Sequence, residues 1–199
     1  MKKRILVWAF MGAFVCLLAM GTLSAHKKEV STVALHPWGY GLSFAGASRS
    51  VGTMPTGKTS YEAVFLGSFF FAISPWDLPF LNPSLRTTLS VGVGSHGVQV
   101  HDASAVLGIE IIRTLNHPLG FMVTNKAVWA PSLTVGGSYL FGYRPDAKEG
   151  WHMLLEASPL KLSHRDFVYE WLVPYAHVDV RQHTIAEWGI VLYRGTVLI

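Results

Sequence analysis

Residues 132–143, Ser-Leu-Thr-Val-Gly-Gly-Ser-Tyr-Leu-Phe-Gly-Tyr, decide the fold class, because large apolar side chains alternate with small or polar ones. Leu133, Val135, Tyr139, Phe141 and Tyr143 stand at odd positions, and the even positions are mostly serine, threonine and glycine. A period of two residues is typical of a β-strand with one apolar face, since successive side chains of a strand point to opposite sides. The stretch is therefore predicted to be a strand.

The same period recurs through the rest of the chain. It is clear in residues 38–45, WGYGLSFA, and 85–94, LRTTLSVGVG. It is less regular in residues 61–73, 103–113, 151–161, 167–179 and 185–199. Turn-rich stretches with Gly, Pro, Asn and Asp separate these segments, at 47–60, 74–84, 116–120, 144–146 and 163–166. About eight short strands without sustained helical spacing indicate an all-β antiparallel sandwich or up-and-down barrel.

The composition of the two strand faces indicates which solvent surrounds the sheet. Of the 199 residues 50% are hydrophobic and only 14% are charged, and the face opposite the large apolar residues carries mainly Gly, Ser, Thr and Ala. A water-soluble barrel would cover its outside with charge, whereas small residues and a few ion pairs suit a narrow interior. We therefore predict an up-and-down antiparallel membrane β-barrel of about eight strands, with its apolar face toward lipid.

The first 25 residues have the layout of a secretory signal peptide. Lys2, Lys3 and Arg4 precede an uncharged run from Ile5 to Met20, and small residues follow as far as Ala25. The run is short for a membrane-spanning helix, which needs about 20 apolar residues. We expect residues 1–25 to be removed after export and residues 26–199 to form one barrel domain.

Removal of that segment changes the charge and the thiol content of the chain. The formal charge of +4 includes the three basic residues of the leader, which has no acid, so the mature chain is nearly neutral. This argues against nucleic acid as a partner. The one cysteine, Cys16, also lies in the leader, so no thiol chemistry is expected of the mature protein.

The architecture resembles that of the small eight-stranded outer-membrane β-barrel proteins of bacteria, the group that includes the OmpA transmembrane domain, OmpX and OmpW. The resemblance covers most of the mature chain and rests on strand number, alternation and export rather than on a diagnostic motif. It implies a bacterial outer-membrane location, with outer-membrane lipids and the assembly machinery as partners. Such barrels usually end in an aromatic residue, commonly Phe, whereas this chain ends in Val197-Leu198-Ile199.

Isolated charges on the small-residue face are expected to point into the barrel. Carboxylates removed from water must be paired or protonated, so we predict a polar network in the lumen centred on Arg86, with Arg144 and His152 as further partners toward one end. The predicted network consists of Glu62, Arg86, Glu110, Glu156, Glu170 and Glu187. Its role is structural, or it forms a narrow path for ions or protons.

Aromatic residues often stand at the ends of the predicted strands. Amphipathic rings prefer the level of the lipid headgroups, so these residues are candidates for two aromatic girdles. The candidates are Trp38, Tyr40, Tyr61, Trp129, Tyr143, Trp151, Trp171, Tyr175 and Trp188.

Other functions find less support in the residues. His177, Asp179 and His183 are the tightest metal-ligand grouping, but no zinc-site spacing occurs, and we predict no metal or cofactor. Ser163 and His164 are adjacent and would point to opposite faces of a strand, so we predict no enzymatic activity.

Several roles remain open. The main prediction is an integral outer-membrane barrel with a structural, surface-interaction or narrow small-solute or ion passage role, with an extracellular ligand or small solute as a further partner. The alternatives are a soluble periplasmic lipocalin-like barrel that binds an apolar ligand and a barrel enzyme that modifies lipid A acyl chains.

Overall fold

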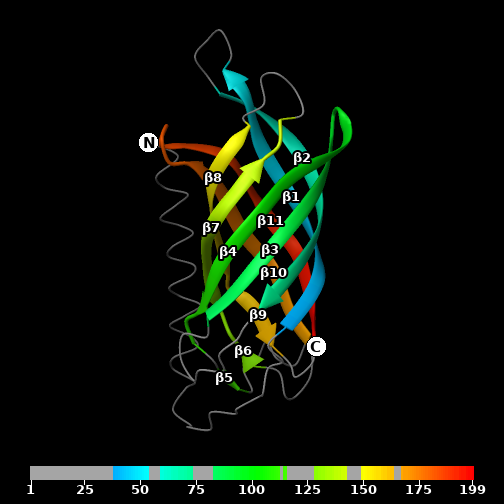
Figure 1. The fold of residues 1–199 in the computed structure, drawn as a ribbon, viewed down its shortest axis with the longest axis vertical. Helices are drawn as coiled ribbons and strands as arrows, with labels where there is room; N and C mark the ends of the chain where they lie inside the picture. Colours follow the sequence, from blue (N-terminus) through cyan, green and yellow to red (C-terminus); the bar gives the residue numbers. More distant parts are fainter. Residues whose placement is uncertain are drawn as a thin grey trace.

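A computed structural model describes residues 38–53, 59–73, 83–112, 114–115, 128–142, 149–163 and 167–199 (Figure 1). The predicted signal peptide lies outside these residues. Within the described part of the chain, no helix has the length and apolar content needed to cross a membrane.

Eight long antiparallel strands form the wall of a closed barrel (Figure 1). They are β1 (Trp38–Thr53), β2 (Thr59–Ile73), β3 (Pro83–Gly94), β4 (Gly97–Glu110), β7 (Ser132–Leu140), β8 (Gly150–Ser158), β10 (Phe167–Asp179) and β11 (Thr184–Leu198). Each pairs with the next along the chain, and β11 returns to pair with β1. The predicted all-β up-and-down barrel is confirmed.

Three short strands extend the wall at the end of the barrel where the chain terminus after β11 lies (Figure 1). They are β5 (Thr114–Leu115), β6 (Val128–Trp129) and β9 (Leu160–Ser163). β9 follows β8 after Pro159 and pairs with both β10 and β6, while β5 pairs with β6. They were not expected as separate strands.

Two strand boundaries differ from those predicted. β1 continues to Thr53, although the glycine and proline content of residues 47–60 predicted a turn from Ala47 onward. β3 and β4 are joined at Ser95 and His96, so β4 begins at Gly97, six residues before the predicted strand 103–113. Gly97 has a φ of +89°, a conformation that glycine adopts without steric cost and that lets the chain reverse within two residues.

The alternation of inward and outward side chains is interrupted at one level of three neighbouring strands. In β11, Val191 and Arg194 both point inward, so the two residues between them face outward together. In β10, Glu170 and Val173 are both buried, and Leu172 between them has a φ of +51°. The strand pair keeps its register across this level, because Trp171 pairs with Tyr193 and Val173 with Val191.

The third interruption falls at Pro159, between β8 and β9. Ser158 is buried before the proline, and Lys161 points into the interior after it. Trp171 of β10 pairs with Leu160, and Tyr175 pairs with Glu156, so the register is the same on both sides of the break. An interruption of this kind removes one step of alternation and thereby exchanges the two faces of a strand.

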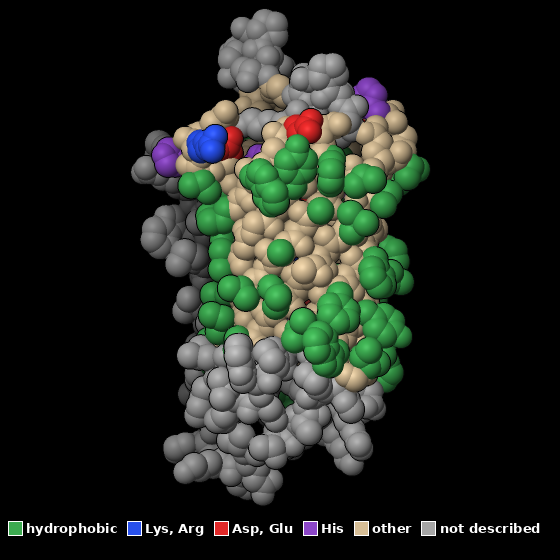
Figure 2. Space-filling view, in the orientation of Figure 1, with side chains coloured by type: hydrophobic (Ala, Val, Ile, Leu, Met, Phe, Trp, Pro, Cys, Tyr) green, Lys and Arg blue, Asp and Glu red, His purple; other side chains and the backbone are tan. Residues whose placement is uncertain are grey.

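The outside of the barrel is apolar and its inside is largely polar. Large hydrophobic side chains stand exposed along the strands, among them Leu42, Phe65, Leu89, Leu107 and Leu192. Figure 2 shows hydrophobic side chains over the barrel wall, while the coloured charged and histidine side chains of this face gather near one end. This is the predicted distribution, the reverse of that in a water-soluble barrel.

Candidate functional site in the barrel interior

The first interior group, the Arg194 cluster, consists of Arg86, Glu156, Glu170 and Arg194. Arg194 Nη2 lies 2.9 Å from Glu156 Oε1, and Arg194 Nη1 lies 3.1 Å from Glu170 Oε2. Arg86 forms a second ion pair with Glu156, and the Arg194 guanidinium lies 6.0 Å from the centre of the Phe70 ring. Glu156 is therefore held between two guanidinium groups, contributed by β3 and β11.

A further ion pair lies beside the Arg194 cluster. Lys161 Nζ is 2.9 Å from Glu110 Oε1, joining β9 to β4. Together with the Arg194 cluster this gives three cationic and three carboxylate side chains, so the formal charges balance. Buried charges are tolerated when each has a partner of opposite sign and hydrogen bonds to satisfy it.

The second interior group, the Glu187 cluster, consists of His101, Tyr175, His177 and Glu187. His101 Nε2 lies 2.6 Å from Glu187 Oε2, and the Tyr175 hydroxyl donates a hydrogen bond of 3.0 Å to Glu187 Oε1. His177 Nε2 lies 3.8 Å from the same Oε1. Glu187 is fully buried, so its carboxylate depends on these groups in place of water.

Arg49 stands next to the Glu187 cluster. It pairs with Glu187 in the register of β1 and β11, and both side chains are fully buried. Arg49 Nη2 donates a hydrogen bond of 2.7 Å to the carbonyl oxygen of Phe141. A cation thus lies on the strand beside the carboxylate, which supplies positive charge to this part of the interior.

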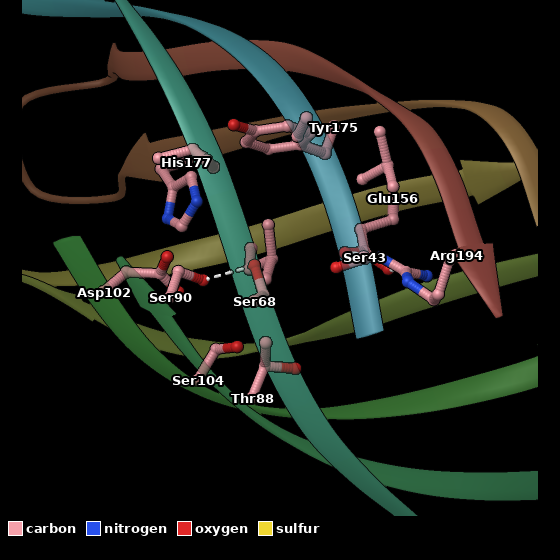
Figure 3. Close-up of a pocket in the computed structure, with 14 residues that line it drawn as sticks. Ser43, Ser68, Thr88, Ser90, Asp102, Ser104, Glu156, Tyr175, His177 and Arg194 are labelled. Carbon is pink, nitrogen blue, oxygen red and sulfur yellow. Dashed lines mark hydrogen bonds and ion pairs between the residues drawn. The ribbon is translucent and has the colours of Figure 1, made fainter. Parts of the chain in front are cut away.

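A cavity of about 40 Å³ lies between the two clusters (Figure 3). Its polar wall is a set of hydroxyl groups from β1 to β4, here called the hydroxyl file: Ser43, Ser68, Thr88, Ser90 and Ser104. The Ser68 hydroxyl donates to Ser90 Oγ at 2.9 Å, and Asp102, the residue opposite Ser90 on β4, lies in the same lining. The rest of the lining includes the apolar side chains of Leu66, Leu154 and Val191.

A second cavity, of about 80 Å³, lies on the other side of Arg194. It is lined by charged groups, by hydroxyls such as Ser84 and Thr134, and by apolar side chains such as Val168. Arg194 lines both cavities. The interior is therefore a packed column with two small polar spaces, as expected of a barrel of eight strands.

The residues of the predicted lumen network do not all lie in the interior. Arg86, Glu110, Glu156, Glu170 and Glu187 lie inside the barrel. The side chain of Glu62, in β2, instead contacts the β3–β4 turn. It accepts hydrogen bonds from the Ser95 backbone N–H at 3.0 Å and from the Ser95 hydroxyl.

The centre of the network also differs from the expectation. Arg86 forms an ion pair with Glu156, whereas Arg194 binds both Glu156 and Glu170. Of the further partners expected, His152 is buried with its Nδ1 2.9 Å from the Gly150 carbonyl oxygen, and Arg144 lies outside the described residues.

Several interior groups were missed by sequence reasoning, namely Arg49, His101, Asp102, Tyr175, His177 and Arg194. Arg49 falls in the turn-rich stretch 47–60, and His101 falls between the predicted strands 85–94 and 103–113. His101 and Asp102 both point inward because β4 has a bulge, with Ser90 opposite Asp102 and Val91 opposite Val100. The predicted network contains five glutamates and one arginine. This excess of negative charge was the sign in the sequence that further cations had to lie inside the barrel.

Most of the predicted girdle residues lie on the outer face. Trp38, Tyr40, Tyr61, Trp151 and Trp188 are exposed. Trp171 is half-buried and stacks on Tyr169, with ring centres 5.8 Å apart. Tyr143 lies outside the described residues.

Trp129 and Tyr175, also expected in the girdles, are buried. Tyr175 points inward because the interruption at Leu172 exchanges the faces of β10. Trp129 is fully buried in β6 beside β9, and its ring N–H donates to the Pro159 carbonyl oxygen at 2.8 Å.

The described residues include no group of three or more His, Cys, Asp and Glu side chains placed to hold a metal ion. His177 points into the barrel, whereas His183 lies in the exposed β10–β11 turn with a φ of +51°. The chain matches no protein-family model, no curated protein and no solved structure.

Proposed function

We propose that the chain is an integral outer-membrane β-barrel protein whose lumen is held closed by paired charges. The observation that carries the proposal is the polarity of the wall: large apolar side chains face out, and the charged and hydroxyl side chains face in. An exposed apolar surface that encircles a protein is unfavourable in water and favourable in hydrocarbon.

The interior argues against a soluble barrel that carries an apolar ligand. Such a protein needs an apolar internal cavity large enough for the ligand. The two interior cavities measure only about 40 and 80 Å³, and charged or hydroxyl groups contribute to the lining of each. Neither suits a hydrocarbon chain.

The spacing of the aromatic residues supports a membrane location. Trp38 and Tyr40 lie near the start of β1, whereas Trp188 and Tyr61 pair with Ser48 and Ser50 near its other end. About ten residues of strand span about 33 Å. With a tilt of about 40° this corresponds to about 25 Å along the barrel axis, the height of the apolar band in outer-membrane barrels.

The paired charges suggest a structural role for the interior. The two ion pairs of Glu156 connect strands that are not neighbours in the sheet, β3 with β8 and β8 with β11. Contacts across the lumen hold opposite walls together and occupy the space through which a solute would pass. The proposal therefore favours a closed barrel over a general diffusion pore.

The test is a membrane-assembly assay on the mature protein. Refolded protein is mixed with phosphatidylcholine vesicles and floated on a density gradient, and samples are run on a detergent gel with and without boiling. We expect the protein to float with the vesicles, to resist alkaline carbonate extraction and to migrate differently after boiling. A protein that remains soluble without detergent or lipid and shows no heat-dependent migration would contradict the proposal and favour the soluble barrel.

A further inference from the structure

His177 connects the Glu187 cluster to the cavity between the two clusters. Its Nε2 faces Glu187, and its Nδ1 is buried without a hydrogen-bond partner. The side chain is 3% exposed and lines the cavity. An imidazole can accept a proton at one ring nitrogen and release one from the other, so this placement suits transfer between the cluster and the cavity.

From His177 the polar groups continue across the cavity. In Figure 3 His177, Asp102 and Ser90 lie toward one end of the pocket, Glu156 and Arg194 toward the other, and Ser68 between them. Ser68 donates to Ser90, and Asp102 stands opposite Ser90 on the neighbouring strand and lines the same cavity. The hydroxyl of Thr88, in the same lining, is buried without a partner.

Hydroxyl groups both donate and accept hydrogen bonds, which is the requirement for relaying a proton. The cavity volume of about 40 Å³ leaves room for about three water molecules, and the second cavity of about 80 Å³ for about six, beside the side-chain groups. Arg194 lies at the junction of the two cavities. Donors and acceptors thus extend from Glu187 to the far side of the Arg194 cluster.

We propose that the barrel passes protons along this route, through His177 and the hydroxyl file, and passes no larger ion. The inference rests on the proposed function, because conduction requires that the barrel cross a membrane. At each step an oxygen or nitrogen binds an incoming proton and releases another to the next group. One bond to hydrogen forms for each that breaks, and no electrons are exchanged.

The exclusion of larger ions follows from size and charge. A metal ion or chloride carries a hydration shell, and the space between the clusters has no room for one. The cations Arg86, Arg194 and Lys161 are paired with Glu110, Glu156 and Glu170, so neither sign of charge is in excess in this part of the route. A proton needs only contact between successive donors and acceptors.

The experiment measures proton flux into vesicles. The mature protein is inserted into vesicles of phosphatidylcholine and phosphatidylglycerol that contain a pH-sensitive dye. A potassium gradient with valinomycin drives protons across the membrane, and insertion is verified by flotation and heat-dependent migration. We expect flux above that of protein-free vesicles for the wild type and its loss for His177→Asn, which keeps a polar side chain but cannot relay a proton through a ring.

Two further variants make the result specific. His152→Asn changes another buried histidine, whose Nδ1 is bonded to the Gly150 carbonyl oxygen, and is expected to keep the flux. Ser68→Ala removes the donor to Ser90 without touching an ion pair and is expected to lose the flux. This second variant decides the question if His177→Asn fails to fold.

Each outcome separates the inference from the proposed function. Inserted, heat-modifiable wild-type protein without flux overturns the proton route and leaves the membrane barrel standing. Failure to insert overturns both. Flux that survives His177→Asn or Ser68→Ala, or a potassium gradient that collapses without valinomycin, shows that the current takes another route or that larger ions pass, and overturns the inference.

Discussion

The guanidinium of Arg194 in β11 binds the carboxylate of Glu156 in β8 through two nitrogen atoms, with Nη2 2.9 Å from Oε1 and Nη1 3.3 Å from Oε2. Because these strands are separated by β10 in the sheet, the pair spans the interior rather than the wall. It is one of the contacts that tie the barrel together across its axis.

Removal of Arg194 is expected to destabilise the barrel strongly. Arg194→Met leaves Glu170 without its guanidinium partner in a buried site, and breaking a buried pair in this way costs about 3–5 kcal/mol. The free energy of unfolding, from guanidinium titrations followed by tryptophan fluorescence in detergent, measures the loss. Arg181→Met, in the exposed β10–β11 turn, is the control and should change it by no more than about 0.5 kcal/mol. Equal effects of the two substitutions would contradict a central role for Arg194.

An arginine introduced on the outer face tests whether that face is surrounded by lipid. Leu89 stands exposed in the middle of β3, and Leu89→Arg is expected to lower the free energy of folding into phospholipid vesicles by about 2–4 kcal/mol, the penalty for Arg near the bilayer midplane. Val98→Arg, beside the β3–β4 turn, is the matched control with an expected loss of about 0–1 kcal/mol near the interface. If both substitutions were equally mild, the outer face would not be in lipid.

The positive φ at Leu172 should make glycine more stable than alanine at this position, the opposite of the usual order within a strand. Within a strand glycine is normally the less stable by about 0.5–1 kcal/mol. At a φ of +51° a Cβ atom costs about 1–2 kcal/mol, so Leu172→Gly is expected to be more stable than Leu172→Ala. Both variants lose the same exposed Leu side chain, which makes each the control for the other. Chemical denaturation of the pair measures the difference, and a more stable alanine variant would mean that the strain is absent.

Loss of the Tyr175 hydroxyl should weaken the Glu187 cluster. Tyr175→Phe removes a hydrogen bond to a buried carboxylate, an interaction that contributes about 1.5–3 kcal/mol. Tyr40→Phe, on the outer face of β1, is expected to stay within about 0.5 kcal/mol of the wild type. Unfolding titrations under identical conditions compare the two. A Tyr175→Phe variant as stable as Tyr40→Phe would show that Glu187 is satisfied by other groups.

The architecture could be predicted because alternation with a period of two is a local property of the sequence. Residues 61–73 and 167–179, for example, were expected as strands and belong to β2 (Thr59–Ile73) and β10 (Phe167–Asp179). The inward direction of Arg86 and Glu156 followed from the same parity.

What could not be predicted depends on departures from that period. One interruption, at Leu172, places Glu170 and Tyr175 on the same side, although five residues of strict alternation would put them on opposite sides. The bulge at His101 likewise turns two consecutive side chains inward. Such irregularities arise from pairing with neighbouring strands and leave no mark in the local pattern, so the Glu187 cluster could not be assembled from the sequence.

The interruptions of alternation at Pro159, Leu172 and Leu192 lie beside one another in neighbouring strands. A change of length in one of these strands therefore affects its pairing with the next. Deleting Leu192 alone would restore strict alternation in β11, with Arg194 and Thr196 still facing inward, and would remove the irregularity in its pairing with β1. It would also leave Leu172 of β10 without an opposite residue, so an even register between β10 and β11 would need a matching change in β10 and, through β10, at the β8–β9 junction. Insertions and deletions in this half of the barrel are therefore constrained to occur as a set, whereas the turns that join the strands can change length one at a time.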